Sequence, residues 1–407
     1  MRIVQANKFY YLKGGAERYY FNLIKLLESK GHEIIPFSMQ DEKNEPSEYS
    51  KYFVSNVDFD KKGQSFKKAR RVLYSLEAKK KFEQLICSTK PDLIHIHNIY
   101  HQISPSILTI AKKYKIPVVE TLHDFKLICP NYTLYSKNEL CEQCKKYRYY
   151  KCALRKCIKN KFWQSLLASK EMYFHKFIRI YENNVNQFLA PSKFVYDKIL
   201  KFGIIKPDQI TILPEFIFDS TGEGVLSFAK SSQSYILYFG RLIKEKGIKT
   251  LINAMKQVKG LELHLAGTGP DEQEFKDLVK KENLNNIKFF GFLDQEKLQQ
   301  EISNSLFVIH PSEVYETFGL SILENYVLNK PVIASNLGAL PEIVKDKQTG
   351  LLFKAGDSQD LADKINYLAN NQDLAKQMGD NAKILTEQKY SSDDHYQKII
   401  KIYEGLL

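Results

Sequence analysis

Short apolar runs alternate with segments of helical periodicity along this chain, and that alternation constrains its fold more than any other feature. The runs are continuous rather than alternating, which is typical of strands buried on both faces. Strands separated by helices in this way predict an α/β fold with parallel sheets. The runs lie at 2–6, 33–37, 92–97, 116–121, 235–239, 261–266, 307–309 and 331–335.

The length of 407 residues predicts two domains, because a single hydrophobic core stops growing well below that size. The same order of strand, loop and helix recurs in both halves without any repeat of sequence. Between the halves, residues 216–234 lose periodicity and gain glycine, serine and lysine. That change is typical of a linker between domains.

The loop after the run at 307–309 carries two carboxylates eight positions apart. A proline ends the predicted strand, and apolar residues from Leu320 onwards begin a helical pattern. Glu316 therefore falls in the strand-to-helix loop, and Glu324 about two turns into the helix. Both carboxylates can face one cleft, and the backbone N–H groups of residues 318–320 offer a seat for a phosphate or a sugar oxygen.

A second motif follows the strand at 235–239, where the sequence reads G-R-L-I-K-E-K-G. Gly240 closes the strand, and two cations stand on the loop and at the start of the next helix. Arg241 can bind phosphate through two parallel hydrogen bonds, and Lys246 adds a point charge. The pair suits a departing nucleoside diphosphate, whose developing negative charge must be offset.

At these residues the chain resembles the retaining glycosyltransferases of family 4, also called group 1, which have the GT-B fold. The resemblance covers nearly the whole chain and is strongest in residues 235–353. It implies an α/β fold of two Rossmann-like, doubly wound domains that face each other across a cleft. The first domain would span 1–215 and bind the acceptor, and the second would span 235–388 and bind the nucleotide sugar. A helix at 389–407 would pack back on the first domain.

The resemblance also implies a reaction and assigns roles to residues. A sugar would move from a nucleotide-diphosphate sugar to a saccharide or lipid-linked saccharide, with retained anomeric configuration and no required cofactor. Glu316 would lie beside the sugar ring, Glu324 would accept hydrogen bonds from the ribose, and His123, in the sequence TLHD, would bind the sugar from the opposite wall. Glu316 and His123 are the candidate catalytic residues, and both a front-face route and a covalent intermediate stay open. The candidate donor-binding residues are Gly240, Arg241, Lys246, Gly267, Gly291, Phe292, Phe318, Gly319, Leu320 and Glu324.

A glycine pair, Gly14 and Gly15, separates the first strand from the first helix. Two glycines let the backbone approach a ligand closely, although the G-x-G-x-x-G pattern of dinucleotide sites is absent and a plain tight turn is the alternative. In the family this loop borders the donor phosphate and the acceptor. His95, His97 and His101 are interpreted as core or loop residues.

Positive charge is concentrated in the first half. The net charge is +13. Residues 1–220 hold 38 Lys and Arg against 22 Asp and Glu, or +16, and residues 221–407 hold 22 against 25, or −3. Such a half suits an anionic membrane surface, an acidic substrate or RNA. A basic RNA-binding protein is therefore one alternative to a glycosyltransferase, although no RNA-binding motif is present and no nucleic acid is expected. A GT-B epimerase is a second, separate alternative.

Two segments carry most of that charge. Residues 66–86 predict one amphipathic helix with a basic face, suited to an anionic membrane or to solvent. Residues 129–170 form an insertion rich in Cys, Lys and Tyr, whose part from Lys137 to Lys170 has ten Lys and Arg against two acids, interleaved with aromatic residues. A membrane interface, a lipid pyrophosphate or RNA would each suit that composition.

Four of the six cysteines lie in the insertion with the spacing C-x2-C-x7-C-x4-C. Cys141, Cys144, Cys152 and Cys157 predict either a small structural zinc site or a set of free thiols. The Asp-x-Asp at 58–60 imitates a metal-binding motif but lies in a polar region, and we interpret it as a coincidence of sequence. No metal is expected in the reaction.

The chain has no apolar run of 18 residues and no signal-peptide pattern at its start. We expect a cytoplasmic protein, with a peripheral place on the inner face of the plasma membrane as an option. The resemblance to family 4 implies that the protein takes part in the assembly of bacterial cell-surface polysaccharide. The nucleotide base, the sugar, the linkage and the oligomeric state stay open.

Overall fold

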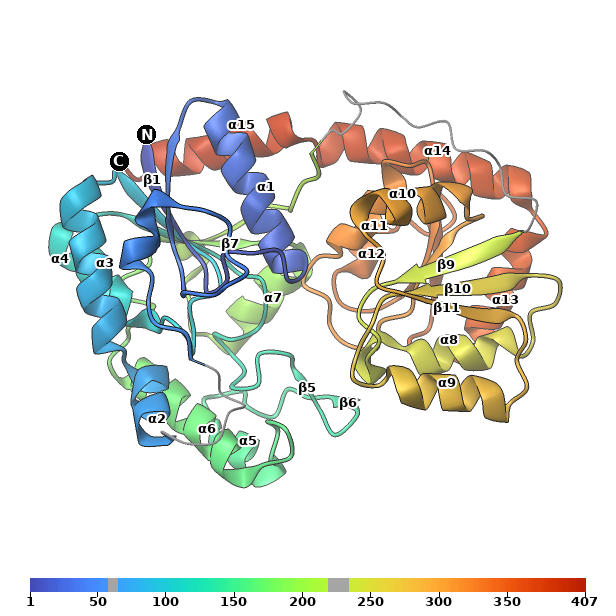
Figure 1. Cartoon of the computed structure of the whole chain (residues 1–407), viewed down its shortest axis with the longest axis horizontal. Helices are drawn as coiled ribbons and strands as arrows, with labels where there is room; N and C mark the ends of the chain where they lie inside the picture. Colours follow the sequence, from blue (N-terminus) through green and yellow to red (C-terminus); the bar gives the residue numbers. More distant parts are fainter. Residues whose placement is uncertain (58–64, 219–233) are drawn as a thin grey trace. The chain divides into compact units, whose positions relative to one another are not determined.

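A computed structural model describes residues 1–57, 65–218 and 234–407, which divide into two compact units (Figure 1). Unit 1 comprises Met1–Glu215 together with Ser392–Leu407, and unit 2 comprises Phe216–Ser391. The Asp-x-Asp at 58–60 and most of the predicted linker at 216–234 lie outside the described residues.

Among the described residues of unit 1, six parallel strands form one sheet in the order β2-β1-β3-β4-β7-β8. The first strand pairs with β2 on one side and with β3 on the other, so the strand order reverses at β1. In an open α/β sheet such a reversal places a crevice at the carboxyl ends of the strands, where ligands bind. The strands are β1 (Arg2–Ala6), β2 (Glu33–Phe37), β3 (Leu93–Ile96), β4 (Val118–Thr121), β7 (Gln187–Ala190) and β8 (Ile210–Ile212).

Helices connect these strands, and local sequence sets where they begin and end. For α7 (Lys193–Phe202), the Ser192 hydroxyl accepts a hydrogen bond from the Val195 N–H at the start, and Gly203 ends the helix with a positive φ of 69°. The other helices of unit 1 are α1 (Gly15–Ser29), α2 (Ser65–Leu73), α3 (Leu76–Thr89), α4 (Leu108–Tyr114), α5 (Tyr150–Arg155), α6 (Phe162–Phe177) and α15 (Ser392–Glu404), with 3-10 turns η1 (Glu48–Tyr52), η2 (Pro105–Ile107) and η3 (Pro207–Gln209).

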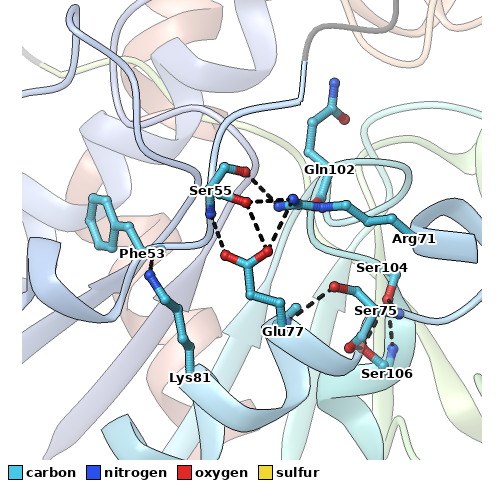
Figure 2. Close-up of polar contacts among 10 residues, drawn as sticks. Phe53, Ser55, Arg71, Ser75, Glu77, Lys81, Gln102, Ser104 and Ser106 are labelled. Atoms are coloured by element: carbon cyan, nitrogen blue, oxygen red, sulfur yellow. Dashed lines mark hydrogen bonds and ion pairs between the residues drawn. The ribbon is translucent and has the colours of Figure 1, made fainter. Parts of the chain in front are cut away.

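The prediction of one basic helix over 66–86 is wrong, because the chain forms two helices with a corner at Ser75. The Ser75 hydroxyl accepts a hydrogen bond from the Ala78 N–H and so begins α3. Figure 2 shows that Arg71, from α2, turns inward to Ser55 and Glu77 instead of facing solvent. This cation therefore belongs to the interior of unit 1 and not to a uniformly basic surface.

The last helix, α15, is part of unit 1 and contacts it through hydrogen bonds that span almost the whole sequence. His395 Nε2 lies 3.0 Å from the Tyr19 hydroxyl, and the Tyr403 hydroxyl lies 2.6 Å from His95 Nδ1. Both of these tyrosines are buried. The α15 helix thus closes over the first strands of the sheet by specific contacts.

Unit 2 repeats the plan: within its described residues, six parallel strands lie in the order β11-β10-β9-β12-β13-β14. The order reverses between β9 and β12, which places the crevice of this unit at their carboxyl ends. The strands are β9 (Tyr235–Phe239), β10 (Glu262–Ala266), β11 (Ile287–Gly291), β12 (Val308–His310), β13 (Val332–Ser335) and β14 (Gly350–Phe353).

The helices of unit 2 pack apolar faces onto this sheet in two hydrophobic clusters. They are α8 (Ile248–Met255), α9 (Glu272–Lys281), α10 (Gln295–Asn304), α11 (Leu320–Tyr326), α12 (Leu340–Ile343), α13 (Ser358–Ala369) and α14 (Gln372–Lys389), with the 3-10 turn η5 (Lys244–Lys246). Since α11 begins at Leu320, Glu324 stands about one turn into its helix, and the prediction of two turns is wrong.

The insertion forms a small subdomain of unit 1. It contains the short hairpin of β5 (Tyr135–Ser136) and β6 (Glu139–Leu140), followed by the packed helices α5 and α6. Figure 1 shows α5 and α6 side by side, and α6 next to α2.

Candidate functional site

The candidate donor residues of unit 2 gather where neighbouring strands end. Gly240 follows β9, Gly267 follows β10, and Gly291 is the last residue of β11. Glu316 lies in the loop after β12. Because parallel strands end at the same edge of a sheet, residues far apart in sequence meet at the crevice between β9 and β12.

The loops after β9 and β10 meet through their backbones. A Cβ on Gly267 would lie 1.9 Å from the Gly240 carbonyl oxygen, so any other residue there would displace the neighbouring loop. The Leu242 N–H also donates to the Thr268 carbonyl at 3.0 Å. The glycines that the sequence placed at these strand ends thus let two loops approach closely and define a firm edge for the crevice.

Glu316 is the centre of a cluster of polar groups. Its Oε1 accepts hydrogen bonds from Lys246 Nζ at 2.6 Å and from the Ser312 hydroxyl at 2.7 Å. His310 Nε2 lies 3.7 Å from the same oxygen. The structure therefore brings together two residues predicted from separate motifs, Lys246 and Glu316, and adds Ser312 and His310, which the sequence interpretation did not single out.

The carboxyl group of Glu316 is held in its ionised form. Burial opposes ionisation, but the charge of Lys246 and the contact with His310 outweigh it and keep the pKa of Glu316 far below its ordinary value. An ionised carboxylate can accept hydrogen bonds from sugar hydroxyls and stabilise nearby positive charge. Glu316 is poor as a proton donor in this state.

Lys246 reaches Glu316 because the loops after β9 and β12 are packed together. A Cβ on Gly247 would lie 1.9 Å from the Pro311 carbonyl oxygen, and Gly247 has a positive φ of 71°. Beside this contact, the Thr250 hydroxyl donates to Glu313 Oε1 at 2.5 Å. The ion pair of Lys246 and Glu316 thus stands on a preorganised frame.

The remaining donor candidates differ in what they offer. The Arg241 side chain is exposed, and the Phe292 side chain is 80% exposed just after β11. Phe318 and Leu320 are buried in the core of unit 2, so a ligand could use their backbone N–H groups but not their side chains. Glu324 lies on α11 with a partly buried side chain.

In unit 1, His123 follows β4 and takes part in a hydrogen-bonded chain. Its Nε2 lies 2.9 Å from Nδ1 of His97, and its Nδ1 lies 3.4 Å from Oε1 of Glu215. Nε2 of His97 in turn lies 2.8 Å from Oε1 of Gln5. The hydrogen bond with His97 therefore orients the His123 ring, and the Glu215 carboxylate lies beside the other ring nitrogen of this buried side chain.

In the hydrogen-bonded series of Gln5, His97 and His123, the ionisation of His97 limits which atoms can donate. Burial, followed by the neighbouring imidazoles, holds the pKa of His97 well below its ordinary value, so His97 is neutral. If its Nε2–H donates to the Gln5 carbonyl, its Nδ1 must accept, and His123 Nε2–H is then the donor between the two rings. In that arrangement His97 is the acceptor of the hydrogen bond between the two rings.

The sequence interpretation treated His97 as a core or loop residue and did not name Glu215. A signal was available for His97: His95 and His97 are two positions apart at the end of a strand, so they point to the same face of the sheet. Their rings are stacked with centroids 4.4 Å apart, and the His97 and His123 rings follow at 5.2 Å. Glu215 comes from a distant loop, and nothing in the local sequence indicated its partner.

The predicted glycine loop begins α1. Gly14 is the residue before this helix, has extended backbone and is exposed, as is Gly15. A Cβ on Gly15 would meet no atom within 4 Å. Packing of the described residues therefore does not require glycine at position 15. Either a ligand of this loop requires the glycine, or its presence is a coincidence of sequence.

Asp124, next to His123, has an unusual environment. Burial raises the pKa of its carboxyl group to about 6, although the ammonium group of Lys8 acts in the opposite direction. A carboxyl group that titrates near neutral pH at the carboxyl edge of an α/β sheet is typical of functional sites. The sequence interpretation had not named Asp124.

The cysteines of the insertion lie in its small core: Cys144 and Cys152 are buried, and Cys157 packs against them. In the described part of the chain, no group of three or more His, Cys, Asp or Glu side chains is arranged to hold a metal ion. The zinc site at Cys141, Cys144, Cys152 and Cys157 stays a prediction, which metal analysis of the purified protein would test.

Among the helices of the described ranges, none is both long enough and apolar enough to cross a bilayer.

Comparison with known proteins gives matches along nearly the whole chain. The family model described as Glycosyltransferase Family 4 matches residues 13–219, and that described as Glycosyl transferases group 1 matches residues 227–385. An uncharacterized glycosyltransferase of Methanocaldococcus jannaschii is 25% identical over 406 residues, covering 100% of this chain and 99% of that protein. The O-antigen chain mannosyltransferase C of Escherichia coli is 27% identical over 176 residues, 43% of this chain and 47% of that protein.

A solved structure, that of Anabaena HepE in complex with UDP and glucose, resembles this chain with a TM-score of 0.68 at 18% identity, covering 100% of both chains. The fold and the family matches define the chain as a glycosyltransferase. It belongs to the group 1 glycosyltransferases of family 4 and has the two-domain α/β fold called GT-B. The matches do not favour the RNA-binding or epimerase alternatives.

Proposed function

We propose that this glycosyltransferase moves a sugar from a nucleotide-diphosphate sugar to a saccharide or lipid-linked saccharide with retention of anomeric configuration. The observation that supports this most is the ion pair of Lys246 with an ionised Glu316 at the carboxyl ends of β9 and β12. A cation for the diphosphate and a carboxylate for the sugar stand side by side there.

The cations would bind the leaving group. Arg241 is exposed and can form paired hydrogen bonds with phosphate, and Lys246 adds charge from within the crevice. The backbone N–H groups of residues 318–320, at the start of α11, would complete the diphosphate site. As the bond between sugar and phosphate breaks, these groups would stabilise the charge that develops on the diphosphate.

The carboxylates would bind the sugars. Glu316 would accept hydrogen bonds from hydroxyls of the transferred sugar and offset positive charge on its ring, as its low pKa permits. Glu324 would accept hydrogen bonds from the ribose. The backbone around Gly291 and Phe292, after β11, would hold the base. Neither a nucleophile nor a metal ion is assigned to the reaction.

The residues of unit 1 would serve the transferred sugar and the acceptor. His97 orients the ring of His123 through their hydrogen bond, and the transferred sugar would bind against this part of unit 1. The loop at Gly14 and Gly15 has open space at Gly15 and would receive a phosphate or the acceptor.

We assign the acceptor to bacterial cell-surface polysaccharide assembly, with the enzyme acting in the cytoplasm at the inner face of the membrane. The name of the E. coli relative, a mannosyltransferase of the O-antigen chain, supports this role. UDP in the HepE complex makes uridine nucleotides the first donors to test.

Donor hydrolysis and transfer to a saccharide, followed by proton NMR, test the proposal. The first-formed product should carry the same anomeric configuration as the donor, and Glu316→Gln should lower kcat/KM by about a hundredfold or more, since it removes charge that acts on the transition state. Inverted product would refute retention, and a Glu316→Gln variant with full activity would refute the role of Glu316.

A further inference from the structure

The insertion presents an unusual exposed surface on α5 and α6. Trp163 is 77% exposed, Phe177 is 87% exposed, and Leu154 is 69% exposed. Large apolar side chains at this degree of exposure are costly in water when they gather in one place. The three belong to one subdomain of unit 1, which directs attention to the arrangement of their helices.

The outward side of α6 is a largely apolar stripe with Lys170 near its middle. At about 100° per residue, eight positions fall within about 140° of the helix circumference, and all except Lys170 are aromatic or leucine. The opposite side packs on unit 1 through small or buried residues such as Ser165, Ala168 and Met172. The stripe consists of Phe162, Trp163, Leu166, Leu167, Lys170, Tyr173, Phe174 and Phe177.

The short helix α5 extends this stripe. The Tyr150 N–H donates to the Tyr173 hydroxyl at 3.3 Å, which fixes α5 beside the edge of the stripe. Tyr150 is 49% exposed, and Leu154 stands one turn further along α5. The stripe of α6 together with Tyr150 and Leu154 is called the α5–α6 surface below.

The charge around this surface is mainly positive, although the exposed carboxylate of Glu139 pairs with Arg155 of α5. Residues 143–181 contain eleven Lys and Arg and a single acid, Glu171. Glu171 is fully buried and accepts a hydrogen bond from Lys126 Nζ at 2.7 Å. Within this fully described stretch, no carboxylate therefore reaches the surface. The exposed cations are Lys146, Arg148, Lys156, Lys159, Lys161, Lys170 and Arg179.

We propose that the α5–α6 surface docks the protein on an anionic phospholipid bilayer, with its aromatic residues in the headgroup region and its cations against lipid phosphates. Aromatic side chains, above all Trp and Tyr, favour that region of a bilayer, and Lys and Arg gain from its negative potential. A helix that lies in the plane of the interface needs one apolar face and flanking cations, which α6 has. A protein partner would more often meet charges of both signs.

The docking does not depend on the proposed glycosyl transfer, because it uses neither the crevice of unit 2 nor the His123 chain. It would bring the enzyme to acceptors anchored in the membrane. The partner is the lipid headgroup layer and not a transmembrane contact, which agrees with the cations along the stripe and its flanks.

The tryptophan makes the test direct, because Trp163 is the only tryptophan of the chain. The full-length protein is titrated with vesicles of phosphatidylcholine alone and of phosphatidylcholine mixed with phosphatidylglycerol. Trp163 emission should shift to shorter wavelength with the mixed vesicles and be quenched by brominated lipid. High salt should weaken the binding, because part of it is electrostatic.

Variants separate the apolar and electrostatic parts. Phe177→Ser should lower the vesicle partition coefficient about tenfold or more, in line with loss of a buried aromatic side chain, and Lys170→Glu should lower it chiefly at low salt. The matched controls are Tyr367→Ser and Lys376→Glu, exposed positions on α13 and α14, which should bind as the wild type does.

Three results would overturn the proposal. One is an unchanged Trp163 spectrum with anionic vesicles; another is equal loss of binding in the controls. The third is self-association: if gel filtration gives a dimer that Phe177→Ser dissociates, and vesicles bind neither form, the surface joins two copies of the chain. Nucleotide binding by the same samples is measured separately, so failure of docking is distinguishable from failure of the enzyme.

Discussion

At the scale of single residues, the glycines of the candidate site are of two kinds. Gly267 is required by the backbone that passes it, whereas Gly15 faces open space in the described structure. The motif patterns alone did not distinguish these cases, because a sequence displays glycine but not the atoms around it. The distinction matters, since the first kind supports the fold and the second leaves room for a ligand.

Substitution of each glycine by alanine should separate these roles. Gly267→Ala should lower the melting temperature by several degrees, because its Cβ would collide with the Gly240 carbonyl and its φ of 134° is unfavourable for alanine. Gly15→Ala should melt like the wild type yet lose kcat/KM, about tenfold, if substrate approaches this loop. Thermal melts and initial rates measure both. Full activity in Gly15→Ala would contradict the binding role of the loop.

Asp124 should make stability depend on pH. Its folded-state pKa of about 6 lies above the ordinary value of 3.8, so its contribution is complete below pH 4 and lost as pH rises through 6. Asp124→Asn should therefore lose less stability than the wild type between pH 4 and 7, by on the order of 2 kcal/mol. Urea unfolding at the two pH values measures the difference. Equal pH dependence in both proteins would rule out a perturbed Asp124.

At the scale of elements, the sequence predicted most strands and the places of the loops after β9 and β12, because apolar runs and glycines are local signals. Lys246 and Glu316 came from separate motifs, and topology brings them within 2.6 Å. The corner between α2 and α3 was missed although the Ser75 cap on Ala78 is a local signal, whereas the partners of Arg71 lie far away in sequence. The place of Glu215 beside His123 was missed because these two residues are also far apart in sequence.

The corner at Ser75 should depend on Arg71. This buried guanidinium donates to the Gln102 carbonyl at 2.7 Å and to the Ser55 carbonyl at 2.6 Å, besides its ion pair with Glu77. Arg71→Met should lower the free energy of unfolding by about 2–4 kcal/mol, because these groups lose their partner. Its neighbour Arg70 is exposed, and Arg70→Met should change stability by less than about 0.5 kcal/mol. If Arg71→Met and Arg70→Met change the free energy of denaturant unfolding equally, the contacts of Arg71 do not stabilise the corner.

At the scale of the whole molecule, the described residues form two units of the same architecture. Each unit has a parallel sheet with a crevice where the strand order reverses. Unit 2 carries the cations and carboxylates suited to a nucleotide sugar, and unit 1 carries the oriented histidine and the basic, aromatic subdomain. The excess of positive charge in the first half thus has a structural place in α5 and α6.

Unit 2 is proposed to bind the nucleotide. A thermal-shift screen measures this binding as the change in melting temperature of the full-length protein with UDP, GDP, ADP and their sugar conjugates. A ligand that binds the folded state at a hundred times its Kd adds about 2.7 kcal/mol of stability. One nucleotide class should raise the melting temperature of the wild type and of Lys249→Ala, which changes an exposed cation on α8, but not that of Arg241→Ala. Equal stabilisation of all three proteins, or stabilisation of none, would contradict the diphosphate site at Arg241.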